Sequence, residues 1–343
     1  MAAVTDLAQG FDTVLFDLDG VIYVGAHAVP HAVEAVGELH RRDVRCAYVT
    51  NNAFRTPEDV AKHLSDLGFR CAVDDVITSP QAAVPLLRSV VPDGSRILVI
   101  GGAGISRCLS EAGYVPVTSL EDQPAAVMQG YSPDLSWRDL AEASYAVASG
   151  IPWIATNPDL TFPTPRGIAP GNGSLVQVVA NATGRVPDAI AGKPEPPLLH
   201  EALARTRARS ALMVGDRLDT DIAAGRRVGI STLLVLTGVT TLRELLEATE
   251  GERPDFVGSD LRVLLSPYPR VLPGEDGASC GEARAWVQGR QLRVEGADFE
   301  NALRACAQVS WDSPGLALEP ALEELAGMAG SVSGVDQEDH HAE

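Results

Sequence analysis

The sequence of 343 residues is poor in aromatic side chains, lysine and cysteine, and it has no long apolar run. Its five cysteines are scattered without a Cys-x-x-Cys pair, which argues against a disulfide framework or a zinc site and favours reduced thiols. No stretch approaches the roughly 18 apolar residues of a membrane-spanning helix. The N-terminus, with Asp6 and Asp12, lacks the pattern of a secretory signal. We therefore expect a cytoplasmic protein that does not contact a membrane.

Positive charge is also scarce. The chain has 27 basic and 46 acidic residues, and its net charge is −19. This balance argues against a nucleic-acid partner or an anionic membrane surface, because both require positive patches. It does not exclude a small anionic ligand, which local amides and a metal ion can hold. The length predicts two or three domains, and a homodimer stays open.

The sequence is organised around a short apolar run, Thr13 to Phe16, that leads into Asp17, Asp19 and Gly20. Such a run is typical of a buried strand in a parallel sheet. Side chains alternate along a strand, so both carboxylates leave the same side at its carboxyl end, where open α/β sheets bind ligands. The two acids repel each other unless a cation lies between them or one stays protonated. Magnesium with a phosphate supplies both conditions, although a plain polar turn uses the same residues.

Two further predicted strands end in polar residues. Thr50, Asn51 and Asn52 form a corner whose amides can hold a phosphate, although an ordinary turn has the same composition. Asp216 follows an apolar strand as Asp17 does and suits an oxygen-rich metal site. Asp221 either supports that site or occupies the first turn of the next helix, where the helix dipole favours an acid.

Lysine occurs at only two positions, Lys62 and Lys193, among the 27 basic residues. The composition favours arginine heavily, so a lysine at position 193, between Gly192 and Pro194, indicates that this position needs a compact point charge. Lys62 fits a solvent-facing helix position.

Strand and helix patterns alternate through residues 13–79 and again through 190–262, which predicts an α/β fold with a doubly wound parallel sheet. A second αβ series over residues 80–189 interrupts the first. From residue 263 a proline-rich linker leads to short strand and helix patterns. The polar, acidic end at 334–343 is expected to be disordered.

The order of these motifs resembles the haloacid dehalogenase superfamily of phosphatases. The chain is most similar to its NagD-type, para-nitrophenylphosphatase subfamily, through the motifs Asp17–Gly25, Thr50–Asn52, Ala155–Asp159, Pro170–Ser174, Gly192–Pro196 and Gly215–Asp221. Within that subfamily it looks most like the actinobacterial glycerol-3-phosphate phosphatases. Those proteins carry a C-terminal segment that resembles a reduced acetyltransferase.

The resemblance implies a Rossmann-like catalytic core formed by residues 1–79 and 190–262. An α/β cap, residues 80–189, would be inserted into this core. Residues 263–343 would form the reduced acetyltransferase-like extension, without the acetyl-CoA-binding loop of an active transferase.

The resemblance also implies roles for the strand-end residues. Asp17 would attack the phosphate and form an aspartyl-phosphate, while Asp19 would protonate the leaving alcohol and then activate water. Magnesium would be held by the Asp17 carboxylate, the Asp19 carbonyl and Asp216, with Asp221 in support. The phosphoryl oxygens would be held by Gly20, Thr50, Asn51, Asn52 and Lys193. The cap residues expected to contact the rest of the substrate are Asn157, Asp159, Arg166 and Asn172.

These expectations describe a magnesium-dependent phosphomonoesterase that acts on a small phosphorylated metabolite, with glycerol 3-phosphate as the first choice. Phosphoglycolate, a nucleoside monophosphate and pyridoxal phosphate are alternatives. A dehalogenase has no use for Asp19 as an acid, and a phosphomutase needs a different cap. A receiver-like regulatory module also uses an acidic magnesium site, but it needs no cap of about a hundred residues.

Overall fold

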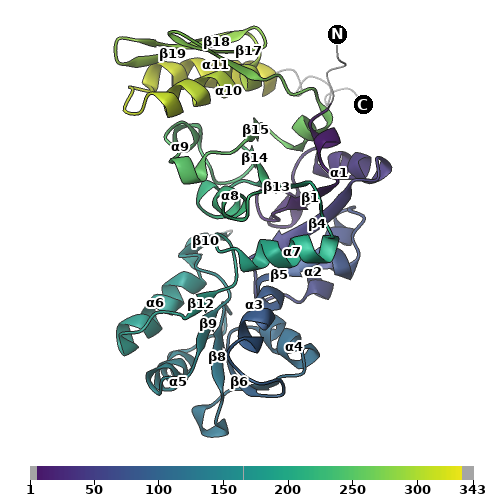
Figure 1. Ribbon diagram of the computed structural model, residues 1–343, viewed down its shortest axis with the longest axis vertical. Helices are drawn as coiled ribbons and strands as arrows, with labels where there is room; N and C mark the ends of the chain where they lie inside the picture. Colours follow the sequence, from purple (N-terminus) through teal and green to yellow (C-terminus); the bar gives the residue numbers. More distant parts are fainter. Residues whose placement is uncertain (1–5, 165, 334–343) are drawn as a thin grey trace.

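The computed structural model describes residues 6–164 and 166–333. Three sheets follow one another along its long axis, with the core in the middle, the cap at one end and the C-terminal unit at the other (Figure 1). The predicted α/β fold with a doubly wound parallel sheet is confirmed. The predicted disordered tail lies outside the described residues. Among the described helices none is long and apolar enough to cross a bilayer.

The core sheet has six parallel strands in the order β15-β14-β13-β1-β4-β5. They are β1 (Thr13–Phe16), β4 (Arg45–Thr50), β5 (Val76–Thr78), β13 (Ala211–Gly215), β14 (Ser231–Val235) and β15 (Phe256–Gly258). The chain builds outward from β1 to β5 and then returns to β13 on the other side of β1. This reversal of strand order makes β1 and β13 the topological switch point, where open α/β sheets bind ligands.

Helices cover both faces of the core sheet, because alternate strand residues point to opposite sides. Phe16 and Tyr48 pack toward α1 and α2, whereas Leu15 and Val49 belong to the apolar cluster on the other face. The core helices are α1 (Ala32–Arg41), α2 (Pro57–Asp66), α7 (Pro197–Thr206), α8 (Ala223–Val228) and α9 (Leu242–Leu246). Thr56 is the N-cap of α2, since its side chain accepts a hydrogen bond from the Asp59 backbone amide.

The cap sheet has five parallel strands in the order β12-β9-β8-β6-β7. They are β6 (Arg96–Ile100), β7 (Val115–Val117), β8 (Ala126–Gln129), β9 (Trp153–Ala155) and β12 (Ala189–Ile190). The edge strands β7 and β12 are short, and the sequence reasoning did not predict them. The cap helices are α3 (Ser79–Arg88), α4 (Ala103–Glu111), α5 (Trp137–Ala148) and α6 (Asn172–Thr183).

The core and the cap share one apolar cluster. Its members include Leu15 and Met213 of the core sheet, Leu87 of α3, and Ile97 and Met128 of the cap sheet. Two antiparallel hairpins add to these units, namely β2 (Tyr23–Val24) with β3 (His27–Ala28) and β10 (Thr161–Thr164) with β11 (Gly167–Pro170).

The C-terminal unit is a four-stranded antiparallel sheet backed by two helices. Its elements are β16 (Val271–Gly274), β17 (Gly277–Cys280), β18 (Ala283–Gln288), β19 (Gln291–Glu295), α10 (Phe299–Asp312) and α11 (Glu319–Ser333). α10 contacts the core directly, because Trp311 Nε1 donates to the Leu245 carbonyl (2.9 Å) and Ser310 Oγ donates to the Leu246 carbonyl (2.7 Å). The division into residues 1–79 with 190–262, 80–189 and 263–343 stays a prediction, and the cap sheet includes Ile190 of β12.

Candidate active site

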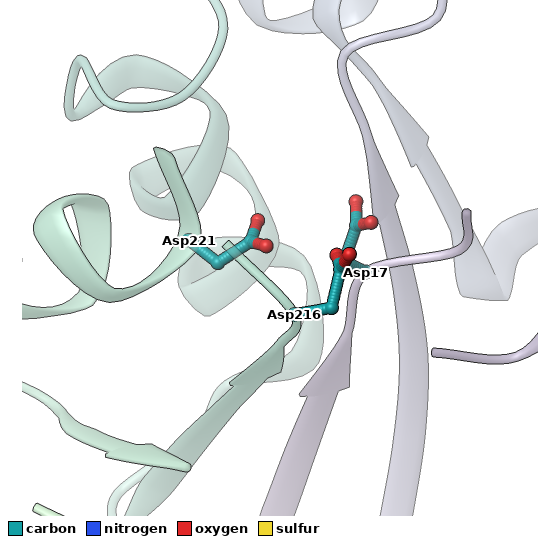
Figure 2. Close-up of side chains that lie close together, drawn as sticks. All are labelled: Asp17, Asp216 and Asp221. Carbon is teal, nitrogen blue, oxygen red and sulfur yellow. The ribbon is translucent and has the colours of Figure 1, made fainter. Parts of the chain in front are cut away.

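Three carboxylates meet at the carboxyl ends of β1 and β13 (Figure 2). Asp17 directly follows β1, Asp216 directly follows β13, and Asp221 lies on a short π-helical segment, Leu218–Ile222, that leads into α8. One carboxylate oxygen from each of the three lies within 4.8 Å of the other two. The sequence therefore predicted correctly that Asp17 and Asp216 lie at one sheet edge.

Lys193 reaches into this cluster from the loop before α7. Its side chain is 2% exposed, and its ammonium group pairs with the Asp17 carboxylate and with Asp221 Oδ1 at 2.8 Å. The ammonium group also donates to the Val49 carbonyl at 3.2 Å. Asp221 thus contacts the buried lysine, and its Oδ2 accepts a hydrogen bond from the Arg217 amide at 3.2 Å. The three carboxylates and one ammonium group leave a formal charge of −2.

Glycines allow the acidic loops to approach each other closely. A Cβ atom at Gly20, whose φ is +84°, would lie 2.6 Å from Asp216 Oδ2, and one at Gly238 would lie 1.9 Å from the same oxygen. The Val239 amide donates to that oxygen at 2.7 Å. Gly215 faces Asp221 in the same way, since its Cβ would lie 2.1 Å from the Asp221 Cβ. The space around the carboxylates is therefore closed by backbone.

Burial and mutual repulsion control the protonation of the acids. Burial, together with the charges of Asp221 and Asp17, raises the pKa of Asp216 to about 8. Burial raises the pKa of Asp221 to about 6, and that of Asp17 also rises, although Lys193 opposes both shifts. Burial would lower the pKa of Lys193, but Asp17 and Asp221 outweigh it and raise that pKa, so the amine stays charged.

Asp19 lies at the exposed side of the cluster. The turn that carries it is fixed because the Leu18 carbonyl accepts hydrogen bonds from the backbone amides of Ile22 (2.9 Å) and Tyr23 (3.1 Å). The surrounding protein displaces water and raises the pKa of the Asp19 carboxyl, against the opposing charges of Arg55 and Lys193. A raised pKa suits a carboxyl group that has to donate a proton.

Thr50 ends β4 beside this cluster and is buried. Its hydroxyl oxygen accepts a hydrogen bond from the Asn52 amide at 3.0 Å, which leaves the hydroxyl hydrogen available to donate. The Asn52 side chain is used within its own turn, where its carbonyl accepts from the amides of Phe54 (2.9 Å) and Arg55 (3.2 Å).

The Asn51 side chain joins two loops. Its Oδ1 accepts from the Lys193 amide at 2.8 Å, and its Nδ2 donates to the Lys193 carbonyl at 2.9 Å. The same Nδ2 donates to both carboxylate oxygens of Asp159, at 3.2 and 3.1 Å. Asn51 therefore connects the corner at Thr50–Asn52 to the lysine loop and to the cap.

The four predicted cap residues occupy different environments. Asn157 and Asp159 lie against Asn51, and Asn157 Nδ2 donates to the Asn51 carbonyl at 2.8 Å. Asn172 is 1% exposed, and its Nδ2 donates to the Asn157 carbonyl at 2.8 Å, so it supports the loop from behind. Arg166 lies exposed in the β10–β11 turn, where its backbone amide donates to Thr164 Oγ1 at 3.3 Å, and among the described residues its side chain has no hydrogen bond or ion pair with the cluster.

Sequence reasoning did not identify the loop after β14 as part of the site. Its Val239 amide holds Asp216, and its Thr237 hydroxyl donates to the Gly20 carbonyl at 2.6 Å. The signal was present, because Thr237 and Gly238 follow a predicted strand at the same sheet edge as Asp17. The contact itself was hidden, since a backbone amide leaves no trace in residue type.

The donor set fits a hard divalent cation. Magnesium prefers carboxylate and carbonyl oxygens, and the cluster offers three carboxylates within a small space. Asp216 Oδ1 is buried and has no hydrogen-bond partner among the described residues, as expected for an oxygen that coordinates a metal. A cation would also offset the charge of −2.

Comparisons with known proteins agree with this geometry. Residues 14–115 match a family model described as haloacid dehalogenase-like hydrolase, and residues 190–264 match one described as HAD-hydrolase-like. The D-glycerol 3-phosphate phosphatase of Mycobacterium tuberculosis is 43% identical over 258 residues, which cover 75% of this chain and 72% of that protein. The chain therefore belongs to the haloacid dehalogenase-like hydrolase family.

Solved structures resemble the chain to different extents. The glycerol phosphate phosphatase from M. tuberculosis in complex with magnesium gives a TM-score of 0.84 at 37% identity, covering 94% of this chain and 99% of that one. The p-nitrophenyl phosphatase from Archaeoglobus fulgidus gives a TM-score of 0.69 at 30% identity, covering 74% and 98%. The resemblance to para-nitrophenylphosphatases is confirmed. The mycobacterial match also includes most of the C-terminal unit, because 94% of the chain extends well into residues 263–343.

Proposed function

We propose that this protein is a magnesium-dependent phosphomonoesterase that hydrolyses a small organic phosphate, with glycerol 3-phosphate as the first candidate. The observation that carries the proposal is the meeting of Asp17, Asp216, Asp221 and Lys193 at the switch point of the core sheet. The similarity to a D-glycerol 3-phosphate phosphatase supports the substrate. The exposed Asp19 and the cap have no purpose in a receiver-like module, so that alternative is not favoured.

The arrangement gives each group a role. The Asp17 carboxylate attacks the phosphorus, and the ester oxygen leaves with a proton from Asp19, whose pKa is raised by the surrounding protein. Asp19 then takes a proton from the water that hydrolyses the aspartyl-phosphate. Lys193, which pairs with Asp17, and the Thr50 hydroxyl, at the end of the neighbouring strand β4, stabilise charge on the phosphoryl oxygens.

The metal would be held by the Asp17 carboxylate, the Asp19 carbonyl and Asp216, with Asp221 in support. When bound, magnesium supplies charge neutralisation for the phosphoryl oxygens. Gly20 and Asn52 would lie beside the phosphoryl group in loops that are held in place, because the Gly20 carbonyl accepts from the Thr237 hydroxyl and the Asn52 side-chain carbonyl accepts from the Phe54 amide. We further propose that the enzyme acts in the cytoplasm, where its five free cysteines stay reduced.

The test is release of inorganic phosphate from a panel that contains glycerol 3-phosphate, phosphoglycolate, a nucleoside monophosphate, pyridoxal phosphate and para-nitrophenyl phosphate. We expect turnover with magnesium, none with EDTA, and the highest kcat/KM on glycerol 3-phosphate. Turnover that is unaffected by EDTA would overturn the metal assignment. A strong preference for another ester would overturn the substrate assignment alone.

A further inference from the structure

Asp159 is a carboxylate placed close to a site that binds an anion. A carboxylate repels a phosphate, so direct contact with the phosphoryl group would weaken binding. Among the described residues, the Asp159 carboxylate accepts hydrogen bonds only from Asn51 Nδ2, at 3.2 and 3.1 Å. Its environment is thus that of a group that holds Asn51.

The loop that carries Asp159 is rigid. The Asp159 backbone carbonyl accepts a hydrogen bond from the Gly173 amide at 2.8 Å, and the Asp159 backbone amide donates to Asn157 Oδ1 at 3.2 Å. The start of α6 presses against this loop through two glycines, since a Cβ at Gly171 would lie 2.2 Å from the Asp159 carbonyl oxygen and one at Gly173 would lie 2.1 Å from that of Pro158. The carboxylate is therefore held in a fixed position toward the core.

Asn51 transmits this position to the reacting groups. Its amide makes two hydrogen bonds to the backbone of Lys193, whose ammonium group pairs with Asp17. The backbone carbonyl of Asn51 accepts hydrogen bonds from Asn157 Nδ2 and from Ser79 Oγ, both at 2.8 Å. A Cβ at Gly192 would lie 2.5 Å from Asn51 Oδ1, so the absence of a side chain at Gly192 lets the lysine loop approach this amide closely.

We propose that Asp159 is a positioning residue, which clamps the cap onto the phosphoryl-binding corner by fixing the orientation of the Asn51 amide. The inference rests on the proposed phosphatase function. It differs from recognition of the leaving group by Asp159, because a clamp affects every phosphate ester and also free phosphate. Leaving-group recognition would affect one ester and spare inorganic phosphate.

The test compares Asp159→Ala with Asp139→Ala in the full chain. Asp139 is a matched cap aspartate, which accepts two hydrogen bonds at the start of α5 (both 2.7 Å) and makes no contact with Asn51. For Asp159→Ala we expect the KM for both glycerol 3-phosphate and para-nitrophenyl phosphate to rise about tenfold. This is the size expected for loss of a charge-assisted hydrogen bond. The dissociation constant of inorganic phosphate, measured calorimetrically with magnesium, should rise by the same factor, while kcat changes less than threefold.

Two further variants make the result specific. Asp159→Asn keeps a carbonyl acceptor for Asn51 and should recover most of the lost affinity. Asp159→Ser has a hydroxyl too short to reach Asn51 and replaces the alanine variant if that one does not fold. In an Asn51→Ala background, Asp159→Ala should add no further loss, because the two residues act through one contact.

Three outcomes would overturn the inference. They are unchanged phosphate affinity in Asp159→Ala, a loss confined to glycerol 3-phosphate, and full additivity with Asn51→Ala. A wild-type chain that hydrolyses no phosphate ester would instead refute the proposed function. The control Asp139→Ala should lower the melting temperature without changing either KM.

Discussion

Without a divalent ion, the folded protein should become less stable as pH rises. The pKa of Asp216 sets the size of this change in the free energy of unfolding. Its pKa is about 8 in the folded chain, against an ordinary value of 3.8. Between these values the folded state holds a proton that the unfolded state has lost. The contribution of Asp216 to the stability of the metal-free protein is therefore fully present below pH 3.8 and is lost as pH rises through 8.

Each pH unit in that window changes the free energy of unfolding by about 1.4 kcal/mol. From pH 6 to pH 8 the ionisation of Asp216 should lower the free energy of unfolding of the metal-free protein by about 2 kcal/mol, since its titration is half complete at pH 8. Unfolding entropy for a chain of this length is roughly 0.7 kcal/mol/K, so the melting temperature should fall by about 3 °C. Magnesium holds the carboxylates charged, so its stabilising effect should grow over the same interval.

The assay is thermal unfolding in EDTA and in saturating magnesium at pH 6, 7 and 8. Asp216→Asn is the matched control, because its amide oxygen can still accept from the Val239 amide but does not titrate. The rest of the chain, including its excess of acidic residues, contributes to both proteins, so the difference between their profiles reports Asp216 and its interaction with Asp221 and Asp17. Parallel profiles for wild type and Asp216→Asn in EDTA would refute the reasoning.

Three other predictions follow from the packing. Lys193→Met leaves buried carboxylates without their partner, so it should lower the free energy of unfolding in EDTA by about 3 kcal/mol and kcat at least about 100-fold. Lys62→Met removes only an exposed ion pair and should leave stability in denaturant titrations unchanged, and equal stability of the two variants would contradict the buried ion pair. Gly238→Ala should weaken magnesium binding, measured by calorimetry, at least about tenfold, because the added Cβ displaces Asp216. Gly251→Ala, whose Cβ meets nothing within 4 Å, should bind magnesium like the wild type, and unchanged affinity in Gly238→Ala would contradict the assignment of Asp216 as a ligand. Deleting residues from 268 onward should uncover α9 and the edge of β15, so it should lower the melting temperature and cause association in size-exclusion chromatography while kcat changes less. A truncated chain that stays monodisperse and melts like the wild type would argue against an integral C-terminal unit.

The strand ends were predictable from the sequence because apolar runs followed by acids mark the carboxyl edge of a parallel sheet. Asp17, Thr50 and Asp216 lie there for that reason. The environments of Asn157 and Asn172 were not predictable, since a polar loop does not reveal which side chains are satisfied by backbone. Asn172 is buried and its Nδ2 donates to the Asn157 carbonyl, while its contact with substrate stays a prediction.

Some of the fold lay outside the reach of local patterns. β7 and β12 are short edge strands, and β16 and β17 contain Pro273, Gly274 and Gly277, which have low strand propensity. The clamp between Asp159 and Asn51 joins residues 108 positions apart and depends on how the cap meets the core.

The most direct test of the account is to find where the phosphoryl group goes. After acid quenching of the enzyme with a 32P-labelled phosphate ester, we expect label on the Asp17-containing peptide in the wild type and more of it in Asp19→Asn with a good leaving group. Asp17→Asn should carry no label and show no turnover while its fold is retained. Phosphate release by Asp17→Asn at the wild-type rate, or label on a different peptide, would contradict the central claim.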